Sequence, residues 1–294
     1  MTLLVATRDR LLVVEPEGGA VAEGAELSGR RLSCLAADPL APGRAWCGTS
    51  GEGLWATDDA GRSWRRVGLA GVEITAVAAS PAEAGRVWAG TEPSALWRGT
   101  EAGDGWRFER ARGLDELPSA PEWSFPPEPA THHVRWIACH PSDPGRLWLA
   151  IEAGALVSTS DGGESWRDRV PGGPYDTHEL AIHPARPEAL RVAAGDGYFE
   201  SDDGGATWRS PEDGLEVSYL RSVAIDPGDP ETVVVSAASH PHRAYVTGLS
   251  DGRLFRREGG GAWRPVRDGW PDPPRTVAPL LAPGRRAGEL WAAD

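Results

Sequence analysis

Lysine is absent from this chain, so its basic side chains are arginines and histidines alone. Cysteine is scarce as well. The 3 cysteines, Cys34, Cys47 and Cys139, are an odd set without the spacing of metal ligands. An odd, unclustered set argues against a disulfide framework or a zinc site. We therefore expect buried free thiols, which are typical of a reducing compartment.

Long apolar runs are also missing, and none approaches the length of a membrane span. The short apolar run of residues 1–16 is interrupted by Arg8, Asp9 and Arg10, and no small-residue cleavage site follows it. We therefore expect no signal peptide and a cytoplasmic protein that does not associate with membranes.

Positive charge is in deficit, since the formal net charge is -13 and the pI is about 5.0. Such a balance disfavours nucleic acid and anionic membranes as partners. Several catalytic signatures are missing too, namely a nucleotide-binding glycine loop, a G-x-S-x-G elbow and a cysteine paired with histidine. The run Gly259-Gly260-Gly261 belongs to a degraded repeat turn.

What the chain does have is a repeated eight-residue pattern, [ST]-x-D-x-G-x-[ST]-W. Its three copies are residues 57–64, 159–166 and 201–208. Each position suits a tight turn: Asp caps backbone N–H groups, Gly supplies a positive φ, and the hydroxyl residue bonds back to the turn. The Trp then begins the next strand and offers a large apolar face. We therefore expect Asp59, Asp161 and Asp203 to be structural.

This pattern resembles the Asp-box, or BNR, repeat of sialidase-like β-propellers, and the resemblance to bacterial BNR-repeat proteins covers essentially the whole chain. It implies an all-β propeller, with the box as a turn away from the active centre. The F/Y-R-I-P motif of true sialidases is absent, and Thr7-Arg8-Asp9 does not replace it.

Aligning the repeats predicts four-stranded antiparallel blades of roughly 40 residues within a single domain, residues 1–294. First strands are expected at residues 32–39, 74–81, 134–141, 177–184, 220–227 and 276–283. Five blades are complete, and we expect six in all, with residues 276–283 joining the N-terminal strands 3–7, 11–15 and 20–27 in one composite blade. Because residues 289–294 resemble another second strand, seven blades with two partial ones are the alternative.

This topology predicts two faces. The Asp-box turns and the turns that close the first strands lie on one face, which we call the bottom. The inter-blade linkers and the loops between second and third strands lie on the other, the top. Two long insertions are assigned to the top: the Pro-rich residues 111–132, expected to cover the site with Trp123, and residues 239–252. His140 and His183 precede bottom turns, where we expect them to act as caps.

Polar residues recur at the start of the first strands, which are expected to line the central channel. Counting back from the closing Pro, position eight holds Arg31, Glu73, His133, Asp176, Tyr219 and Arg275, and position six holds Ser33, Thr75, Arg135, His178, Arg221 and Val277. Glu92, Glu152 and Asp196 are expected beside them, at the top ends of second strands. Such a ring is either a wet channel mouth without chemistry or a binding site.

The sequence therefore predicts a propeller that binds a small polar, anionic ligand at the top mouth, with turnover undecided. His178, Tyr219 and His133 are the candidates for proton transfer. Binding is assigned to Arg31, Glu73, Arg135, Glu152, Asp176, Arg221, Arg275 and Trp123. The alternatives are a glycosidase of exo-sialidase type, with Tyr219 as nucleophile, a metal enzyme that uses His133 or His178 with Asp176 or Glu152, and a protein-interaction scaffold. No cofactor is predicted, and no residue is assigned as a metal ligand.

Overall fold

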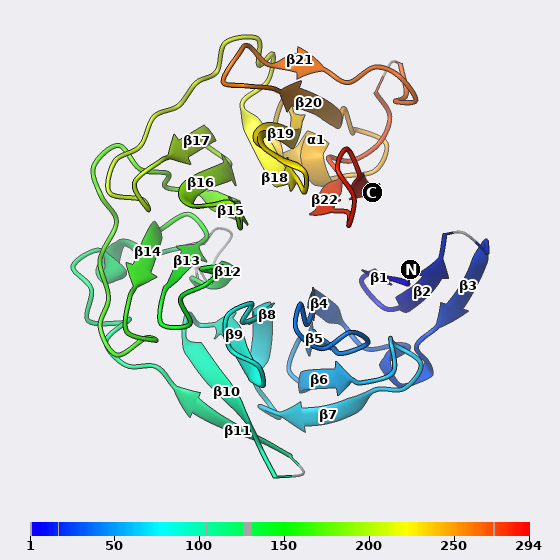
Figure 1. Ribbon diagram of the computed structural model, residues 1–294, viewed down its shortest axis with the longest axis vertical. Helices are drawn as coiled ribbons and strands as arrows, with labels where there is room; N and C mark the ends of the chain where they lie inside the picture. Colours follow the sequence, from blue (N-terminus) through cyan, green and yellow to red (C-terminus); the bar gives the residue numbers. More distant parts are fainter. Residues whose placement is uncertain (1, 17, 104, 126–130, 273) are drawn as a thin grey trace. The chain divides into compact units, whose positions relative to one another are not determined.

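Antiparallel strands follow one another along nearly the entire chain (Figure 1). The computed structural model describes residues 2–16, 18–103, 105–125, 131–272 and 274–294. Its strands are β1 (Leu3–Ala6), β2 (Leu11–Glu15), β3 (Ala20–Glu23), β4 (Leu32–Ala37), β5 (Ala45–Thr49), β6 (Gly53–Thr57), β7 (Arg65–Gly68), β8 (Glu73–Ala79), β9 (Arg86–Glu92), β10 (Leu96–Ala102), β11 (Gly105–Arg110), β12 (Val134–Cys139), β13 (Leu147–Ile151), β14 (Ala155–Thr159), β15 (Thr177–His183), β16 (Arg186–Ala194), β17 (Gly197–Ser201), β18 (Tyr219–Asp226), β19 (Asp229–Ala238), β20 (Arg253–Arg257), β21 (Arg264–Pro265), β22 (Leu280–Pro283) and β23 (Leu290–Ala293). The helices are the short η1 (Ala25–Leu27), η2 (Ala120–Glu122) and α1 (Pro241–Tyr245).

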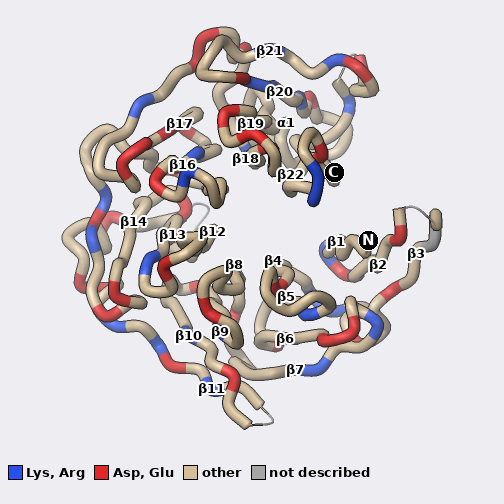
Figure 2. Tube along the Cα trace, in the orientation of Figure 1, with Lys and Arg blue, Asp and Glu red and all other residues tan. Residues whose placement is uncertain are grey.

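The chain divides into two compact units. The first unit is residues 1–151 and 157–167, and the second is residues 152–156 and 168–294. The sheets β1-β2-β3, β4-β5-β6-β7 and β11-β10-β9-β8 belong to the first unit, and β15-β16-β17, β18-β19-β20-β21 and β22-β23 to the second. The sheet β12-β13-β14 contains the boundary, which falls within β14. Arginines and acidic residues are interspersed along both units (Figure 2).

The predicted four-stranded meander is confirmed for β4–β7, β8–β11 and β18–β21. In the sheets β12–β14 and β15–β17 the prediction of a full fourth strand is wrong. Its place is taken by single bridges, Ser158 to Arg167 and Glu200 to Arg209. Proline explains the shortfall, because Pro171 and Pro211 follow these bridges closely and have no N–H to donate to a ladder.

The two ends of the chain form a three-stranded sheet, β1-β2-β3, and a two-stranded sheet, β22-β23. The predicted C-terminal first strand is shorter than expected, since β22 begins at Leu280, and residues 290–293 form its partner strand. These two sheets belong to different units, so the number of blades stays a prediction.

The three Asp-boxes fold in the same way. In the second unit, the Asp203 carboxylate accepts hydrogen bonds from the Thr207 N–H at 2.9 Å, the Thr207 hydroxyl at 2.6 Å and the Ser201 hydroxyl at 2.7 Å. Asp59 and Asp161 make the equivalent contacts. These hydrogen bonds lower the pKa of each of the three carboxyls to about 2.

Each Asp-box turn lies at the same end of its sheet as the turn that closes the first strand. Ala60 donates its N–H to the Gly43 carbonyl at 2.8 Å, and Gly204 donates to Glu188 at 2.9 Å. The predicted histidine caps are also present, since His140 Nδ1 accepts from Asp143 N–H at 3.0 Å and His183 Nδ1 accepts from Ala185 N–H at 3.1 Å. The bottom assignment of these turns therefore holds sheet by sheet.

The cores within each unit consist of aliphatic residues from the strands and of a few aromatic rings. In the first unit the buried Trp46 ring meets Trp106 edge to face, with 5.4 Å between centroids, and in the second Tyr198 meets Trp263 at 4.8 Å. The three cysteines are free thiols, and burial raises the pKa of Cys34 to about 11 and of Cys139 to about 12. Among the described residues, no helix is long and apolar enough to cross a membrane.

The Asp203 hydrogen bonds predict a pH-dependent contribution to stability. At pH 7, Asp203→Ala should lower the free energy of unfolding, because each lost hydrogen bond is worth about 0.5–1.5 kcal/mol net. The folded-state pKa lies below the ordinary value of about 3.9, so this stabilisation is present above pH ~4 and is lost as the pH falls towards 2. Urea unfolding of both proteins between pH 7 and pH 2 measures the difference.

The matched control is Asp9→Ala, which removes an exposed carboxylate outside the boxes. It should leave the unfolding midpoint within error of wild type. If the difference in unfolding free energy between Asp203→Ala and wild type stayed constant down to pH 2, the effect could not be assigned to the carboxylate.

Candidate functional site

A β-bulge interrupts the first strand of five successive sheets at the same place. The register with the second strand shifts around Ser33, Thr75, Arg135, His178 and Arg221. These are the residues that the sequence placed six positions before the closing Pro. A bulge inserts one extra residue and turns its side chain away from the regular alternation. The polar column is therefore built by a repeated backbone irregularity.

The bulge side chains bond to the first strand of the next sheet. The Ser33 hydroxyl donates to the Ile74 carbonyl at 2.5 Å, and the Thr75 hydroxyl donates to Val134 at 2.7 Å. In the second unit, His178 Nδ1 is 2.5 Å from the Leu220 carbonyl, and Arg221 Nη1 donates to Ala278 at 2.6 Å. These hydrogen bonds join neighbouring sheets, so the column has a structural role that the sequence analysis did not foresee.

His178 differs from the serine and threonine because it has a second polar atom. A carbonyl can only accept, so the contact with Leu220 requires a proton on Nδ1. In the neutral ring, Nε2 then carries a lone pair. Nε2 lies 3.7 Å from both Glu152 Oε1 and Asp176 Oδ2, and 3.4 Å from the Tyr219 hydroxyl. We call these four residues the His178 cluster, and all of them belong to the second unit.

Asp176 is held by the backbone around it. Its Oδ1 accepts the Ala153 N–H at 3.0 Å, its own N–H donates to Asp196 at 3.1 Å, and its carbonyl accepts the Gly195 N–H at 2.8 Å. A Cβ on residue 195 would overlap the Asp176 carboxylate, so glycine is required there. Ala153 itself has a φ of 48°, an uncommon value outside glycine, in the turn that follows Glu152.

Burial controls the electrostatics of the cluster. The His178 side chain is 0% exposed and the Glu152 side chain 8%, whereas Asp176 keeps 27% of its side-chain surface in solvent. Burial raises the pKa of the Asp176 carboxyl, although the neighbouring His178 acts in the opposite direction. It raises the pKa of the Tyr219 phenol as well, and the adjacent Tyr245 adds to that shift.

Tyr245, on α1 in the 239–252 insertion, extends the cluster towards solvent. Its hydroxyl accepts from Tyr219 at 3.3 Å, and the Arg221 guanidinium lies 4.7 Å from its ring centroid. Sequence reasoning missed Tyr245 because it sits outside the aligned strands. It also missed Gly195, although a glycine at the end of a second strand, two residues before the third, was a signal that could have been read.

Of the remaining residues assigned to binding or proton transfer, Arg275 belongs to the second unit and the others to the first. Arg275 is exposed, and its carbonyl accepts from Ser250. In the first unit, His133 Nδ1 lies 3.7 Å from Glu92, and the His133 ring packs against Phe125. Arg31 is exposed, while Glu73 and Arg135 are half-buried.

Trp123 in the 111–132 insertion is buried. Its Nε1–H donates to Ser119 at 2.9 Å, and its ring meets His132 edge to face. Prolines in this insertion predict a lack of regular structure, and that prediction is wrong for the short helix η2. Pro121 begins that helix, where its missing N–H costs nothing. Pro126, Pro127 and Pro129 lie outside the described residues.

The expectation of an exposed polar rim is wrong for three of its residues, since His133, His178 and Tyr219 are buried. For His178 the bulge explains this, because it turns the position-six side chain onto the neighbouring strand instead of into solvent. His133 and Tyr219 stand at position eight, and their rings pack against Phe125 and His178. Access to the His178 cluster lies through Asp176 and Tyr245, which keep exposed surface.

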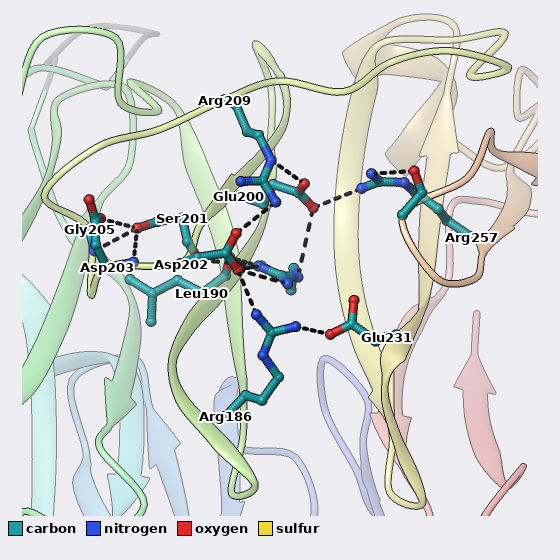
Figure 3. Close-up of polar contacts among 12 residues, drawn as sticks. Arg186, Leu190, Glu200, Ser201, Asp202, Asp203, Gly205, Arg209, Glu231 and Arg257 are labelled. Carbon is teal, nitrogen blue, oxygen red and sulfur yellow. Dashed lines mark hydrogen bonds and ion pairs between the residues drawn. The ribbon is translucent and has the colours of Figure 1, made fainter.

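A second charged cluster in the same unit is structural (Figure 3). The buried Glu200 accepts from Arg257 and Arg209, each at 2.7 Å, and Asp202 pairs with Arg191 at 3.3 Å. Burial by itself would raise the pKa of Glu200, but the hydrogen bond from Arg257 and the nearby arginine charges lower it overall. Opposite charges are matched here at hydrogen-bond distance.

Several solved structures share the fold of this chain. The GH74 xyloglucanase from Xanthomonas campestris is 14% identical, with a TM-score of 0.64, and the match covers 90% of this chain and 44% of that one. YCF48 bound to D1 peptide is 16% identical, with a TM-score of 0.62 and coverage of 100% and 77%. The Cps50 (Swd1) β-propeller domain of Myceliophteria thermophila is 12% identical, with a TM-score of 0.68 and coverage of 99% and 89%.

These likenesses, together with the successive antiparallel sheets, identify the fold as a β-propeller, as the sequence predicted. At such low identity they say nothing further about activity. The chain spans 33% to 44% of the length of the GH74 enzymes that it matches. Neither a protein-family model nor a curated protein matches it.

The bulge hydrogen bonds predict a stability loss when one is removed without a change of shape. Thr75→Val keeps the side-chain volume but leaves the Val134 carbonyl without its hydroxyl donor, which should cost about 1–3 kcal/mol of unfolding free energy. Thr276→Val is the matched control. Among the described residues the Thr276 hydroxyl is buried without a hydrogen bond. Chemical denaturation should show a loss for Thr75→Val alone, and equal effects would contradict the assignment.

Proposed function

We propose that this chain is a ligand-binding β-propeller that holds a small polar molecule at the outer side of the His178 cluster, against Asp176, Tyr219 and Tyr245. The observation that carries the proposal is the convergence of a carboxylate, an imidazole and two phenols from separate strands and loops onto one point. Such convergent polar groups, partly buried and fixed in orientation, are what ligand sites require.

The charges around this point suggest the chemistry of the ligand. The Arg221 guanidinium beside Tyr245 favours an anionic group on that side, in line with the anion expected from the sequence. Asp176 and Glu152 repel an anion and favour a hydrogen-bond donor or a cation on the other side. We therefore propose a ligand that carries both an acidic group and a donor, and sugar acids and amino acids are the first classes to test.

Binding is a better proposal than glycosidase turnover. In a sialidase-type reaction Tyr219 would attack as the nucleophile, yet burial raises the pKa of its phenol and keeps it protonated. The carboxylate oxygens of Glu152 and Asp176 lie within 4.8 Å of each other. That separation argues only against the inverting route, which places a water between two carboxyl groups roughly 6.5–9.5 Å apart, so the case against a sialidase-type reaction rests on Tyr219.

A protein or peptide partner is a second candidate. It is favoured by the exposed apolar side chains Val246 and Leu249, which are 43% and 58% exposed in the 239–252 insertion beside Tyr245. YCF48, which has the same fold, was solved with a bound peptide.

The proposal predicts which substitutions weaken binding. In a thermal-shift screen of sugar acids, amino acids and small carboxylic acids, ligands should stabilise the wild-type protein in proportion to their occupancy. For a ligand so found, Tyr245→Phe should raise Kd roughly twofold to tenfold, because it removes one hydroxyl. Asp176→Asn should weaken a ligand that bears a donor or a cation. Isothermal titration measures both.

Tyr175→Phe is the matched control, since Tyr175 is an exposed tyrosine whose ring lies near Arg169 and not at the cluster. It should leave Kd unchanged. A ligand that binds all four proteins equally would contradict the assigned place. Capture of a protein partner that Val246→Ser releases, with no response from Tyr245→Phe, would favour the second candidate.

A further inference from the structure

Three potential metal ligands meet in the His178 cluster. Nε2 of His178, Oε1 of Glu152 and Oδ2 of Asp176 lie within 4.8 Å of one another. An imidazole with two carboxylates is a ligand set that suits zinc, manganese or iron(II). Residue types alone do not make a metal site. The orientation of these three atoms determines whether they can share one ion.

The first step is the tautomer of His178. The hydrogen bond from Nδ1 to the Leu220 carbonyl places a proton on Nδ1, so Nε2 is the ring atom that a metal ion would bind. This is the second contact that metal-bound histidines usually make, because it fixes the tautomer and the ring orientation. The side chain is fully buried, so the ring is held in place by its surroundings.

The second step is the spacing around Nε2. Two carboxylate oxygens lie 3.7 Å from this nitrogen, which is too far for a hydrogen bond. A metal ion between the three atoms could bind all of them. Ligand atoms around an ion with bonds of about 2.1 Å lie about 3.0–3.4 Å apart, so the two 3.7 Å separations from Nε2 need to shorten by only a few tenths of an ångström.

Other first strands carry a hydroxyl residue at the position of His178. Ser33 and Thr75 occupy the same bulge position and make the same bond to the next strand with one hydroxyl each. Histidine preserves that bond and adds a second nitrogen, directed at the carboxylates. Asp176 is placed to meet it, since its Oδ1 is bound to Ala153 N–H and its Oδ2 faces Nε2.

We propose that His178, Glu152 and Asp176 bind one divalent transition-metal ion, with zinc as the best-matched probe. This inference deepens the proposed function, because a metal at this point would receive the acidic group of a ligand despite the two carboxylates. Calcium, which prefers oxygen ligands alone, should bind poorly.

The test uses His178→Thr, which installs the residue that the chain itself uses at Thr75. It retains a hydroxyl for the Leu220 carbonyl and removes Nε2. After treatment with EDTA and its removal, both proteins should unfold at similar temperatures. Zinc should then stabilise the wild type with one ion bound per chain, by isothermal titration, and Co²⁺ should give visible d–d absorption. His178→Thr and Asp176→Asn should lose the shift and the absorption.

His240→Ala/His242→Ala is the control for adventitious zinc, because these two histidine rings meet edge to face in the 239–252 insertion. It should retain the wild-type response. No zinc-dependent shift in the wild type, or an equal shift in His178→Thr, would overturn the metal site. If the metal site fails in this way, small-molecule binding that persists in EDTA-treated protein leaves the proposed function standing.

Discussion

The bond from each bulge side chain to the next first strand is the interaction on which the rest of this structure depends. Adjacent sheets share isolated backbone contacts, such as the bridge between Ser50 and Glu73, and side chains add further polar contacts between them. Ser33, Thr75 and His178 each meet a backbone carbonyl of the neighbouring first strand, and Arg221 donates to Ala278, just before β22. Because a buried carbonyl is costly to leave unpaired, this position selects a hydrogen-bond donor.

This requirement for a hydrogen-bond donor explains why the contact between sheets and the candidate site share one residue, His178. The serine hydroxyl donates its one proton to the next strand, whereas a histidine that makes the same bond has a second ring nitrogen available for another contact. Where His178 replaces the hydroxyl residue, the turn after β13 contributes Glu152 and the loop before β15 contributes Asp176. The candidate site is therefore an elaboration of a structural contact. The Glu200 cluster uses the same kinds of charged residues, but each is matched, and it stabilises the packing of neighbouring sheets.

The sequence predicted the parts of the fold that depend on local chemistry. The Asp-box pattern predicts its turn because Asp, Gly and the hydroxyl residue bond within eight positions, and His140 and His183 cap turns only two or three residues away. The missing fourth strands after Arg167 and Arg209 could have been read from Pro171 and Pro211. The alignment also brought Asp176, His178 and Tyr219 into adjacent columns, which are in contact in the structure.

The sequence did not predict the features that depend on contacts with a neighbouring sheet. No local sequence feature indicates the bulge at His178, so the column of polar residues was interpreted as a solvated rim. In the structure the His178 side chain is buried and bonds to the Leu220 carbonyl. Tyr245 was missed because its place follows from the course of the 239–252 insertion.

The protonation of His178 Nδ1 tests this account most directly, because both the contact between sheets and the proposed metal site require a proton on this nitrogen. Long-range ¹H–¹⁵N spectra of the metal-free protein, labelled at histidine and assigned with His178→Thr, report the protonation of each ring nitrogen. The account predicts a ring that carries a proton on Nδ1. A ring protonated at Nε2 alone would contradict it, because Nδ1 could then make no hydrogen bond to the Leu220 carbonyl.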